Sequence, residues 1–172
     1  MPRITGQHKQ PAPSALSPIE EEVIGLFVHY AQILSLPKSL GEIYGLLFCS
    51  PVPLPLDAFV ARLQISKGSA SQGLRILRTL NAITPITLEG DRREHFIPET
   101  RLRNIVTGIL RERIQPQLET TTARLERLDQ LTSQSDPDSE IAIRLKRLQA
   151  WNEKMRNLLP FVTKMVEPEA LA

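Results

Sequence analysis

Residues 66–78 carry a series of side chains that can hydrogen-bond to bases or attract phosphate. Hydroxyl and amide groups both donate and accept hydrogen bonds, so they suit the edges of bases in the major groove of DNA. We expect Ser69, Ser71 and Gln72 to contact bases. Lys67 should bind guanine or phosphate, and Arg75 and Arg78 should contact the DNA backbone. The candidate DNA-binding residues of this stretch are Ser66, Lys67, Ser69, Ser71, Gln72, Arg75 and Arg78.

Helical spacing would place most of these side chains on one exposed face. Ala70, Leu74 and Leu77 recur at helical intervals and should turn inward, and Ser66 should cap the N-terminus of the helix. The polar residues near that N-terminus then face outward. This is the end of a recognition helix that reaches base edges in helix-turn-helix complexes.

A second short helix should precede this one. It would bury an apolar face, and Ala61 is small enough to let the following helix cross nearby. The two helices around a tight turn predict a helix-turn-helix. The apolar residues expected to be buried in the first of them are Leu56, Phe59, Val60 and Leu63.

The pattern after Leu80 changes from helical to extended. Residues 83–88 and 93–98 flank a turn at residues 89–92, which predicts a β-hairpin. A hairpin with a basic tip directly after a helix-turn-helix predicts a wing. Arg92 and Arg93 at the tip are expected to enter or flank the minor groove, although either could pair with Glu89 or Glu94, and we expect only one to insert.

The remainder of the N-terminal half is predicted to be helical. Ser17 and Glu20 form a capping-box pattern at the start of one helix, and residues 39–42 form a second such pattern before a nearly all-apolar, buried helix. Residues 1–16 are polar and proline-containing, which predicts a flexible tail.

Residues 101–172 are predicted to form two long amphipathic helices joined by a loop near residues 132–139, with a kink or break at Pro116. Two such helices have more apolar surface than one small chain can cover, so we expect a homodimer. Asn152 in the seam could fix register, or it could lie at the seam edge facing water. The predicted dimerisation residues are Leu118, Leu125, Leu128, Leu145, Leu148, Asn152, Met155, Leu159 and Val162.

Three ordered motifs resemble the GbsR-type winged-helix regulators, a branch near the MarR family. The resemblance covers roughly residues 34–118 and is carried by residues 39–47 (SLGEIYGLL), 65–71 (ISKGSAS) and 90–96 (GDRREHF). It implies a bacterial or archaeal homodimeric repressor or activator, sometimes tuned by a small molecule such as choline.

The predicted fold class is mainly α: a winged helix-turn-helix with a small β-hairpin wing plus long C-terminal dimerisation helices. We expect a tail at residues 1–16, a DNA-binding domain at 17–100 and a helical dimerisation arm at 101–172. The predicted partners are double-stranded DNA and a second copy of the chain. A small effector could enter between the domain and the arm, lined by Phe27, Tyr30, Tyr44 and Trp151, although such aromatics are more often core.

Composition restricts the function classes further. The net charge is only +2, but residues 62–103 hold eight basic residues against four acidic ones, so charge placement matters more than the total. The single Cys49 allows no internal disulfide and suits a reducing cytoplasm, where it should be a small buried residue rather than a redox sensor. No apolar run approaches the ~20 residues needed to cross a bilayer, and the N-terminus has no signal-peptide core.

An enzyme is not expected. His8, His29 and His95 have no metal-ligand spacing, no glycine-rich phosphate loop is present, and Cys49 has no evident base nearby. We therefore predict no catalytic residue, no metal and no cofactor. The alternative function is a winged-helix adaptor that binds proteins and not DNA.

Overall fold

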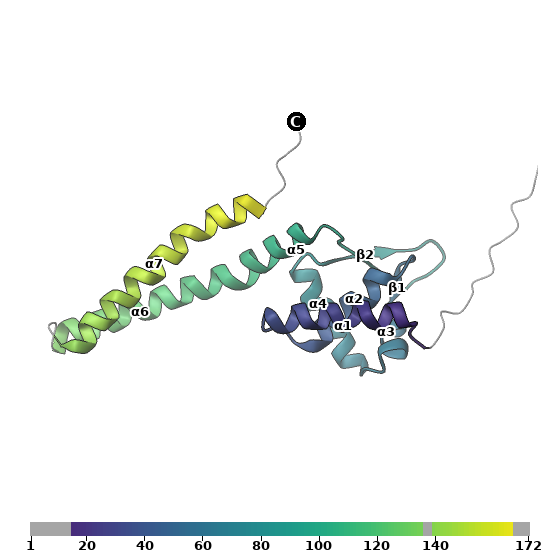
Figure 1. The fold of residues 1–172 in the computed structure, drawn as a ribbon, viewed down its shortest axis with the longest axis horizontal. Coiled ribbons are helices and arrows are strands. Elements are labelled where there is room, and N and C mark those ends of the chain that lie inside the picture. Colours follow the sequence, from purple (N-terminus) through teal and green to yellow (C-terminus); the bar gives the residue numbers. More distant parts are fainter. Residues whose placement is uncertain (1–14, 136–138, 167–172) are drawn as a thin grey trace, which may run out of the picture. The chain divides into compact units, whose positions relative to one another are not determined.

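The chain is mainly helical with a small antiparallel sheet (Figure 1). The computed structural model describes residues 15–135 and 139–166, so residues 1–14 of the predicted tail lie outside it. The predicted fold class, a winged helix-turn-helix followed by long helices, is confirmed. The elements in order are α1 (Pro18–Ile33), α2 (Lys38–Cys49), β1 (Leu54–Pro55), α3 (Leu56–Leu63), α4 (Lys67–Thr79), β2 (Ile83–Thr87), β3 (Glu94–Pro98), α5 (Leu102–Ile109), the π-helical η1 (Leu110–Ile114), α6 (Gln115–Ser135) and α7 (Glu140–Val166).

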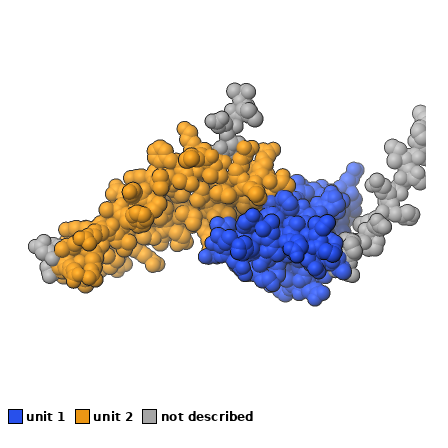
Figure 2. Space-filling view, viewed as in Figure 1, with its two compact units in different colours: residues 1–78, 83–98 blue, residues 79–82, 99–172 orange. Residues whose placement is uncertain are grey.

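These elements form two compact units, coloured separately in Figure 2. The first holds residues 1–78 and 83–98, and the second holds residues 79–82 and 99–172. The helix-turn-helix and the sheet therefore share one unit, and the long helices belong to the other.

The α1–α2 pair forms the base of the first unit. Gly41 and Gly45 lie one helical turn apart on α2, and a Cβ at either would come within 2.6 or 2.8 Å of α1 backbone atoms. Only glycine therefore permits this approach. The α2 helix is buried along most of its length, as predicted, but the second capping box is wrong. The helix begins at Lys38, one residue before Ser39, and Glu42 instead forms an ion pair with Lys38 at 2.9 Å.

The helix-turn-helix forms where the sequence predicts it. Between α3 and α4, Gln64 adopts a left-handed backbone conformation (φ 54°) within a turn of three residues. The interpretation of Ala61 is wrong, because this residue is exposed. The close approach is made by Gly73 of α4, where a Cβ would lie 2.4 Å from Cδ1 of Ile43 on α2.

The predicted hairpin is the larger part of a three-stranded sheet of order β1-β3-β2. β2 pairs with β3 in antiparallel register, with Pro85 opposite Phe96. Because β2 is an edge strand, the missing N–H of Pro85 is tolerated. The short β1 was not predicted; its Leu54 pairs with the opposite side of Phe96 and ties the proline-rich segment before α3 to the wing.

A buried ion pair joins α1 to α3. Nη2 of Arg62 donates to both carboxylate oxygens of Glu20, at 2.9 and 2.8 Å, and the Arg62 side chain is only 7 % exposed. The same carboxylate accepts the backbone N–H of Ser17 at 2.8 Å, which completes the predicted capping box. These hydrogen bonds, the one from Ser17 first and those from Arg62 next, lower the pKa of Glu20 below its usual value.

The second unit is an antiparallel helical hairpin in which α7 runs back along α6 (Figure 1). The predicted irregularity at Pro116 is a π-helical turn, η1, directly before α6. Proline donates no N–H and its ring crowds the carbonyl four residues earlier, that of Glu112, so a wider turn relieves the clash. The predicted loop at 132–139 begins too early, because α6 continues to Ser135.

The contact between α6 and α7 contains both apolar and polar groups. Leu125 and Ala142 are buried, and Nδ2 of the buried Asn152 donates to Oγ1 of Thr122 at 2.8 Å. Nε2 of Gln149 donates to the Leu125 carbonyl at 3.1 Å. The hypothesis that Asn152 faces water at the seam edge is therefore wrong.

None of the helices in the described part of the chain is long and apolar enough to span a membrane.

We expect Glu20→Gln to lower the free energy of unfolding at pH 7 by about 2–3 kcal/mol, because it removes one partner of a buried ion pair. The folded-state pKa of Glu20 is depressed, so its contribution is present above its unfolded pKa and lost as pH falls through the folded one. The gap between variant and wild type should therefore narrow from pH 6 to pH 3 in urea unfolding. The exposed Glu21→Gln on the same helix is the control and should stay within about 0.5 kcal/mol of wild type; an equal loss in both variants contradicts the interpretation.

Candidate DNA-binding surface

The two faces of α4 are divided as the sequence predicts. Ala70, Leu74 and Leu77 are buried. Ser66 lies at the N-cap, where its Oγ accepts the backbone N–H of Ser69 at 3.0 Å and shares a hydrogen bond of 2.9 Å with the Ser69 hydroxyl. The polar residues predicted to face outward are all exposed: Lys67, Ser69, Ser71, Gln72 and Arg75.

The charge on this surface is less one-sided than the sequence count suggests. Arg62 is buried against Glu20 and adds nothing to the exposed basic charge. Arg78 lies 3.6 Å from Glu94 of β3, with both side chains more than half exposed. An exposed pair of this kind contributes little energy, so Arg78 remains available to a phosphate.

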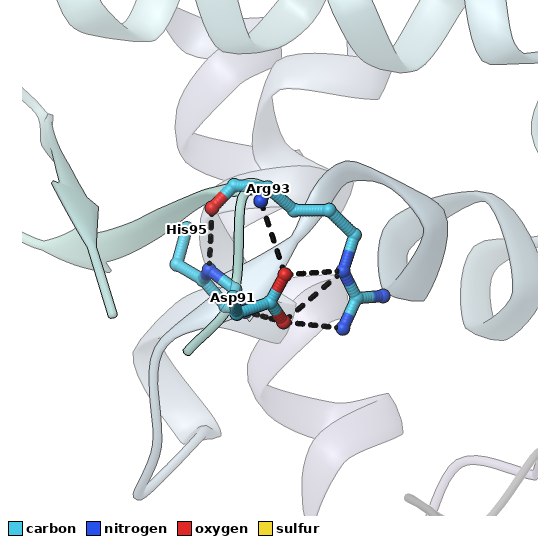
Figure 3. Close-up of polar contacts among 3 residues, drawn as sticks. All are labelled: Asp91, Arg93 and His95. Atoms are coloured by element: carbon cyan, nitrogen blue, oxygen red, sulfur yellow. Dashed lines mark hydrogen bonds and ion pairs between the residues drawn. The ribbon is translucent and has the colours of Figure 1, made fainter. Parts of the chain in front are cut away.

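The tip of the wing is organised by one carboxylate, that of Asp91 (Figure 3). The Arg93 guanidinium donates to it through Nε at 3.0 Å and Nη2 at 2.6 Å, and the Arg93 backbone N–H donates at 3.0 Å. These bonds hold the pKa of Asp91 far below its usual range. The partner of Arg93 is thus Asp91 and neither of the glutamates considered from the sequence, Glu89 and Glu94. Arg92 is exposed, and no described residue pairs with it.

His95 supports this tip from beneath. It is 4 % exposed, its Nδ1 lies 3.0 Å from the Arg93 carbonyl, and its Nε2 lies 3.6 Å from Oδ2 of Asp91 (Figure 3). In the sequence, His95 is a candidate only for metal binding, and it lacks ligand spacing. Two features of the sequence could have indicated a structural role: His95 follows Asp91 by four residues, and it lies within the second predicted strand of the hairpin.

Other candidate groups in the first unit have structural surroundings. Burial, and secondarily the charge of Glu20, raises the pKa of the Cys49 thiol, which disfavours the reactive thiolate. Phe27 packs edge-on against Tyr44 with ring centroids 4.7 Å apart and also contacts Tyr30. Trp151, proposed to line a pocket with them, lies on α7 in the second unit and is 60 % exposed. Within the described ranges, no three His, Cys, Asp or Glu side chains gather to hold a metal ion.

The predicted dimerisation residues divide into three classes by exposure in the single chain. Leu125 and Asn152 are buried in the α6–α7 contact. Leu128, Leu148 and Val162 are exposed. The half-buried members are Leu118, Leu145, Met155 and Leu159.

Comparison with known proteins supports the fold. A solved structure described as that of a transcriptional regulator matches 86 % of this chain and 97 % of its own, with a TM-score of 0.64 and 19 % sequence identity. At this identity the likeness shows the fold alone. No protein-family model and no curated protein sequence matches the chain.

Ser66→Ala should destabilise the chain by about 1 kcal/mol, because it removes the N-cap of α4. Ser71→Ala is the matched control: this serine is exposed on the same helix, and no described group bonds its hydroxyl, so its change should stay within about 0.5 kcal/mol. Urea unfolding monitored by circular dichroism measures both. Equal stability of the two variants would show that the cap contributes nothing.

Proposed function

We propose that the chain is a sequence-specific DNA-binding transcriptional regulator, acting in the cytoplasm as a homodimer and most simply as a repressor. The observation that carries this proposal is the exposed, capped N-terminal half of α4, which belongs to the same compact unit as an arginine-tipped wing. The structural neighbour described as a transcriptional regulator supports it. Because this neighbour is only 19 % identical in sequence, it does not support a particular family. The GbsR-type assignment is part of our proposal and depends on the three sequence motifs.

Base recognition is assigned to the first two turns of α4. Ser71 and Gln72 are exposed, and neither side chain bonds to another described residue, so both are free to meet a base edge. Ser69 shares its hydrogen bond with Ser66 and can accept from or donate to a base only in part. Lys67 would bind guanine or phosphate, and Arg75 and Arg78 the backbone.

For the wing, we propose Arg92 as the residue that inserts into the minor groove. The Arg93 guanidinium already donates to Asp91, and moving it onto DNA would break these charge-assisted hydrogen bonds. Arg92 sacrifices no such contact. Arg93 then contacts the adjacent backbone while it remains held by Asp91.

Dimerisation is assigned to exposed apolar residues of the arm, residues 101–172. Leu148, Trp151, Leu158 and Val162 of α7 follow one another at heptad-like steps of three, seven and four residues, and all are exposed in the single chain. A stripe of this length on a water-exposed helix is characteristic of a protein contact. In such a dimer the recognition helices would enter successive major grooves of an inverted repeat, with half-sites about 10 base pairs apart.

The adaptor hypothesis remains the second candidate function. A winged helix can dock proteins without binding nucleic acid, and the fold alone does not distinguish the two. The chemistry of α4 favours DNA binding: a protein-docking face is rich in aromatic and apolar groups, whereas the exposed half of α4 carries hydroxyl, amide and basic side chains.

Gln72→Ala should reduce the preference for one or two base pairs of the operator by about 1–3 kcal/mol each, because a base-edge contact is lost. Arg75→Ala is the paired variant and should weaken all duplexes alike, since phosphates carry no sequence. Competition binding against single-base operator variants, found by genomic footprinting, measures both. An unchanged preference in Gln72→Ala would exclude this residue from base recognition.

The salt dependence of binding tests DNA binding against the adaptor hypothesis. With about four phosphate contacts per subunit, a dimer should show a log–log slope of roughly −7 for affinity against salt concentration. Fluorescence anisotropy with random and operator duplexes measures it. An adaptor would show neither appreciable affinity nor a slope.

A further inference from the structure

The polar contacts at the tip of the wing form a closed ring (Figure 3). The Asp91 carboxylate accepts the backbone N–H of Arg93 at 3.0 Å, and the Arg93 carbonyl lies 3.0 Å from Nδ1 of His95. Nε2 of His95 lies 3.6 Å from Oδ2 of Asp91 and closes the ring. The backbone of Arg93 is thus held at its N–H by one side chain and at its carbonyl by the other.

This ring determines where the imidazole carries its proton. A carbonyl oxygen only accepts hydrogen bonds, so Nδ1 of His95 is the donor to Arg93. In a neutral imidazole the other nitrogen, Nε2, then carries a lone pair and no proton. Asp91 stays ionised, because the hydrogen bonds from Arg93 hold its pKa far below its usual range. Neutral His95 therefore turns a lone pair toward a carboxylate, whereas protonated His95 turns an N–H toward it.

The contact between Asp91 and His95 is largely shielded from water. The His95 side chain is 5 % exposed and that of Asp91 is 21 % exposed. Charges in such surroundings interact more strongly than they do in water. Histidine is also the side chain that ordinarily changes its charge between about pH 5 and 8. The contact therefore has the composition of a proton-dependent one.

The elements packed around β3 define the other charges that could act on His95. β1 and β2 flank β3 and place Pro55 and Ile86 opposite His95, and neither strand contains an ionisable side chain. The helices α2 and α3 also pack against β3. Their ionisable residues are Lys38, Glu42, Tyr44, Cys49, Asp57 and Arg62.

Several of the charged groups near the wing have other partners. These ion pairs are Lys38 with Glu42, Arg62 with Glu20, and Arg78 with Glu94. The charge of Asp57 acts on Arg93. The carboxylate that contacts the imidazole of His95 is that of Asp91.

We propose that Asp91 and His95 form a proton-linked pair that positions the tip of the wing. With a proton on His95, the ring closes through an ion pair and the backbone of Arg93 is held on both sides. Without that proton, Nε2 and the carboxylate repel each other, and the contact that closes the ring is lost. Protonation of His95 therefore stabilises this conformation of the tip.

The consequence for DNA binding rests on the proposed function; the pair itself does not. A phosphate that shares the Arg93 guanidinium with Asp91 adds negative charge near the imidazole, and this favours the protonated form. The chain should therefore take up a proton at His95 when it binds DNA. By linkage, the protonated chain should bind DNA more tightly.

NMR titration of the histidine rings in the full chain, between about pH 5 and 9, tests the pair without DNA. Asp91→Asn should move the titration midpoint of His95 to lower pH by at least about half a unit, because an opposite charge nearby favours the charged form. Glu94→Gln is the matched control. It removes a carboxylate next to His95 in the chain, one that pairs with Arg78, and should shift the midpoint by less than half as much.

The nitrogen shifts of wild-type His95 give a second readout that needs no variant. Above the midpoint they should show the proton on Nδ1. A proton on Nε2, an unchanged midpoint in Asp91→Asn, or an equal shift in Glu94→Gln overturns the proposal.

DNA affinity at two pH values tests the consequence. The chain has three histidines, and His8→Asn/His29→Asn leaves His95 as the only one. In this background, fluorescence anisotropy at constant salt should show binding about fivefold tighter at pH 6 than at pH 8. Adding His95→Asn should abolish the difference, while its amide can still donate to the Arg93 carbonyl.

The two experiments separate the pair from the proposed function. If Asp91→Asn moves the His95 midpoint and the chain has no affinity for DNA at either pH, the proposed function fails and the pair stands. If DNA is bound and the pH dependence survives His95→Asn, the proposed function stands and the link between the pair and DNA is overturned.

Discussion

Burial of one face of α4 is the constraint from which the arrangement of the candidate DNA-binding surface follows. Ala70, Leu74 and Leu77 are buried, and α4 approaches α2 closely because Ile43 occupies the space of the side chain that Gly73 lacks. Once that face is buried, helical geometry determines which residues of α4 point toward solvent, among them Lys67, Ser71 and Gln72. The base recognition that we propose would therefore depend on an apolar contact that touches no base.

The Arg62–Glu20 pair extends this constraint to the helix before the turn. A charge pair out of water is costly, and Nε of Arg62 finds no partner among the described residues, so the pair adds less stability than its short contacts suggest. Its geometric effect is specific, however. One guanidinium fixes α3 to the first turn of α1, and the same carboxylate caps that turn, so the start of α1 and the position of α3 cannot change independently.

Local sequence signals predicted most of the helix-turn-helix and the wing, because each of these signals depends on only a few consecutive residues. The cap at Ser66, the buried positions of α4 and the strand alternation after Leu80 all belong to this class. The misses are non-local. The burial of Arg62 needs a carboxylate 42 positions away, the β1 strand needs Phe96, and the role of Gly73 needs the side chain of Ile43. No periodicity within a window reveals such partners.

The helical arm shows the same limit in another form. A heptad pattern indicates that an apolar stripe will be covered, and it does not indicate whether the cover is the same chain or another. Leu125 and Asn152 are buried within the hairpin itself. The Asn152 amide donates to Thr122 and so fixes the register of α6 against α7. Leu148 lies on the same predicted seam and is left exposed. In the proposed dimer, such a seam would serve two contacts: Asn152 bonds Thr122 within the hairpin, and the exposed apolar residues would provide the surface for a second chain.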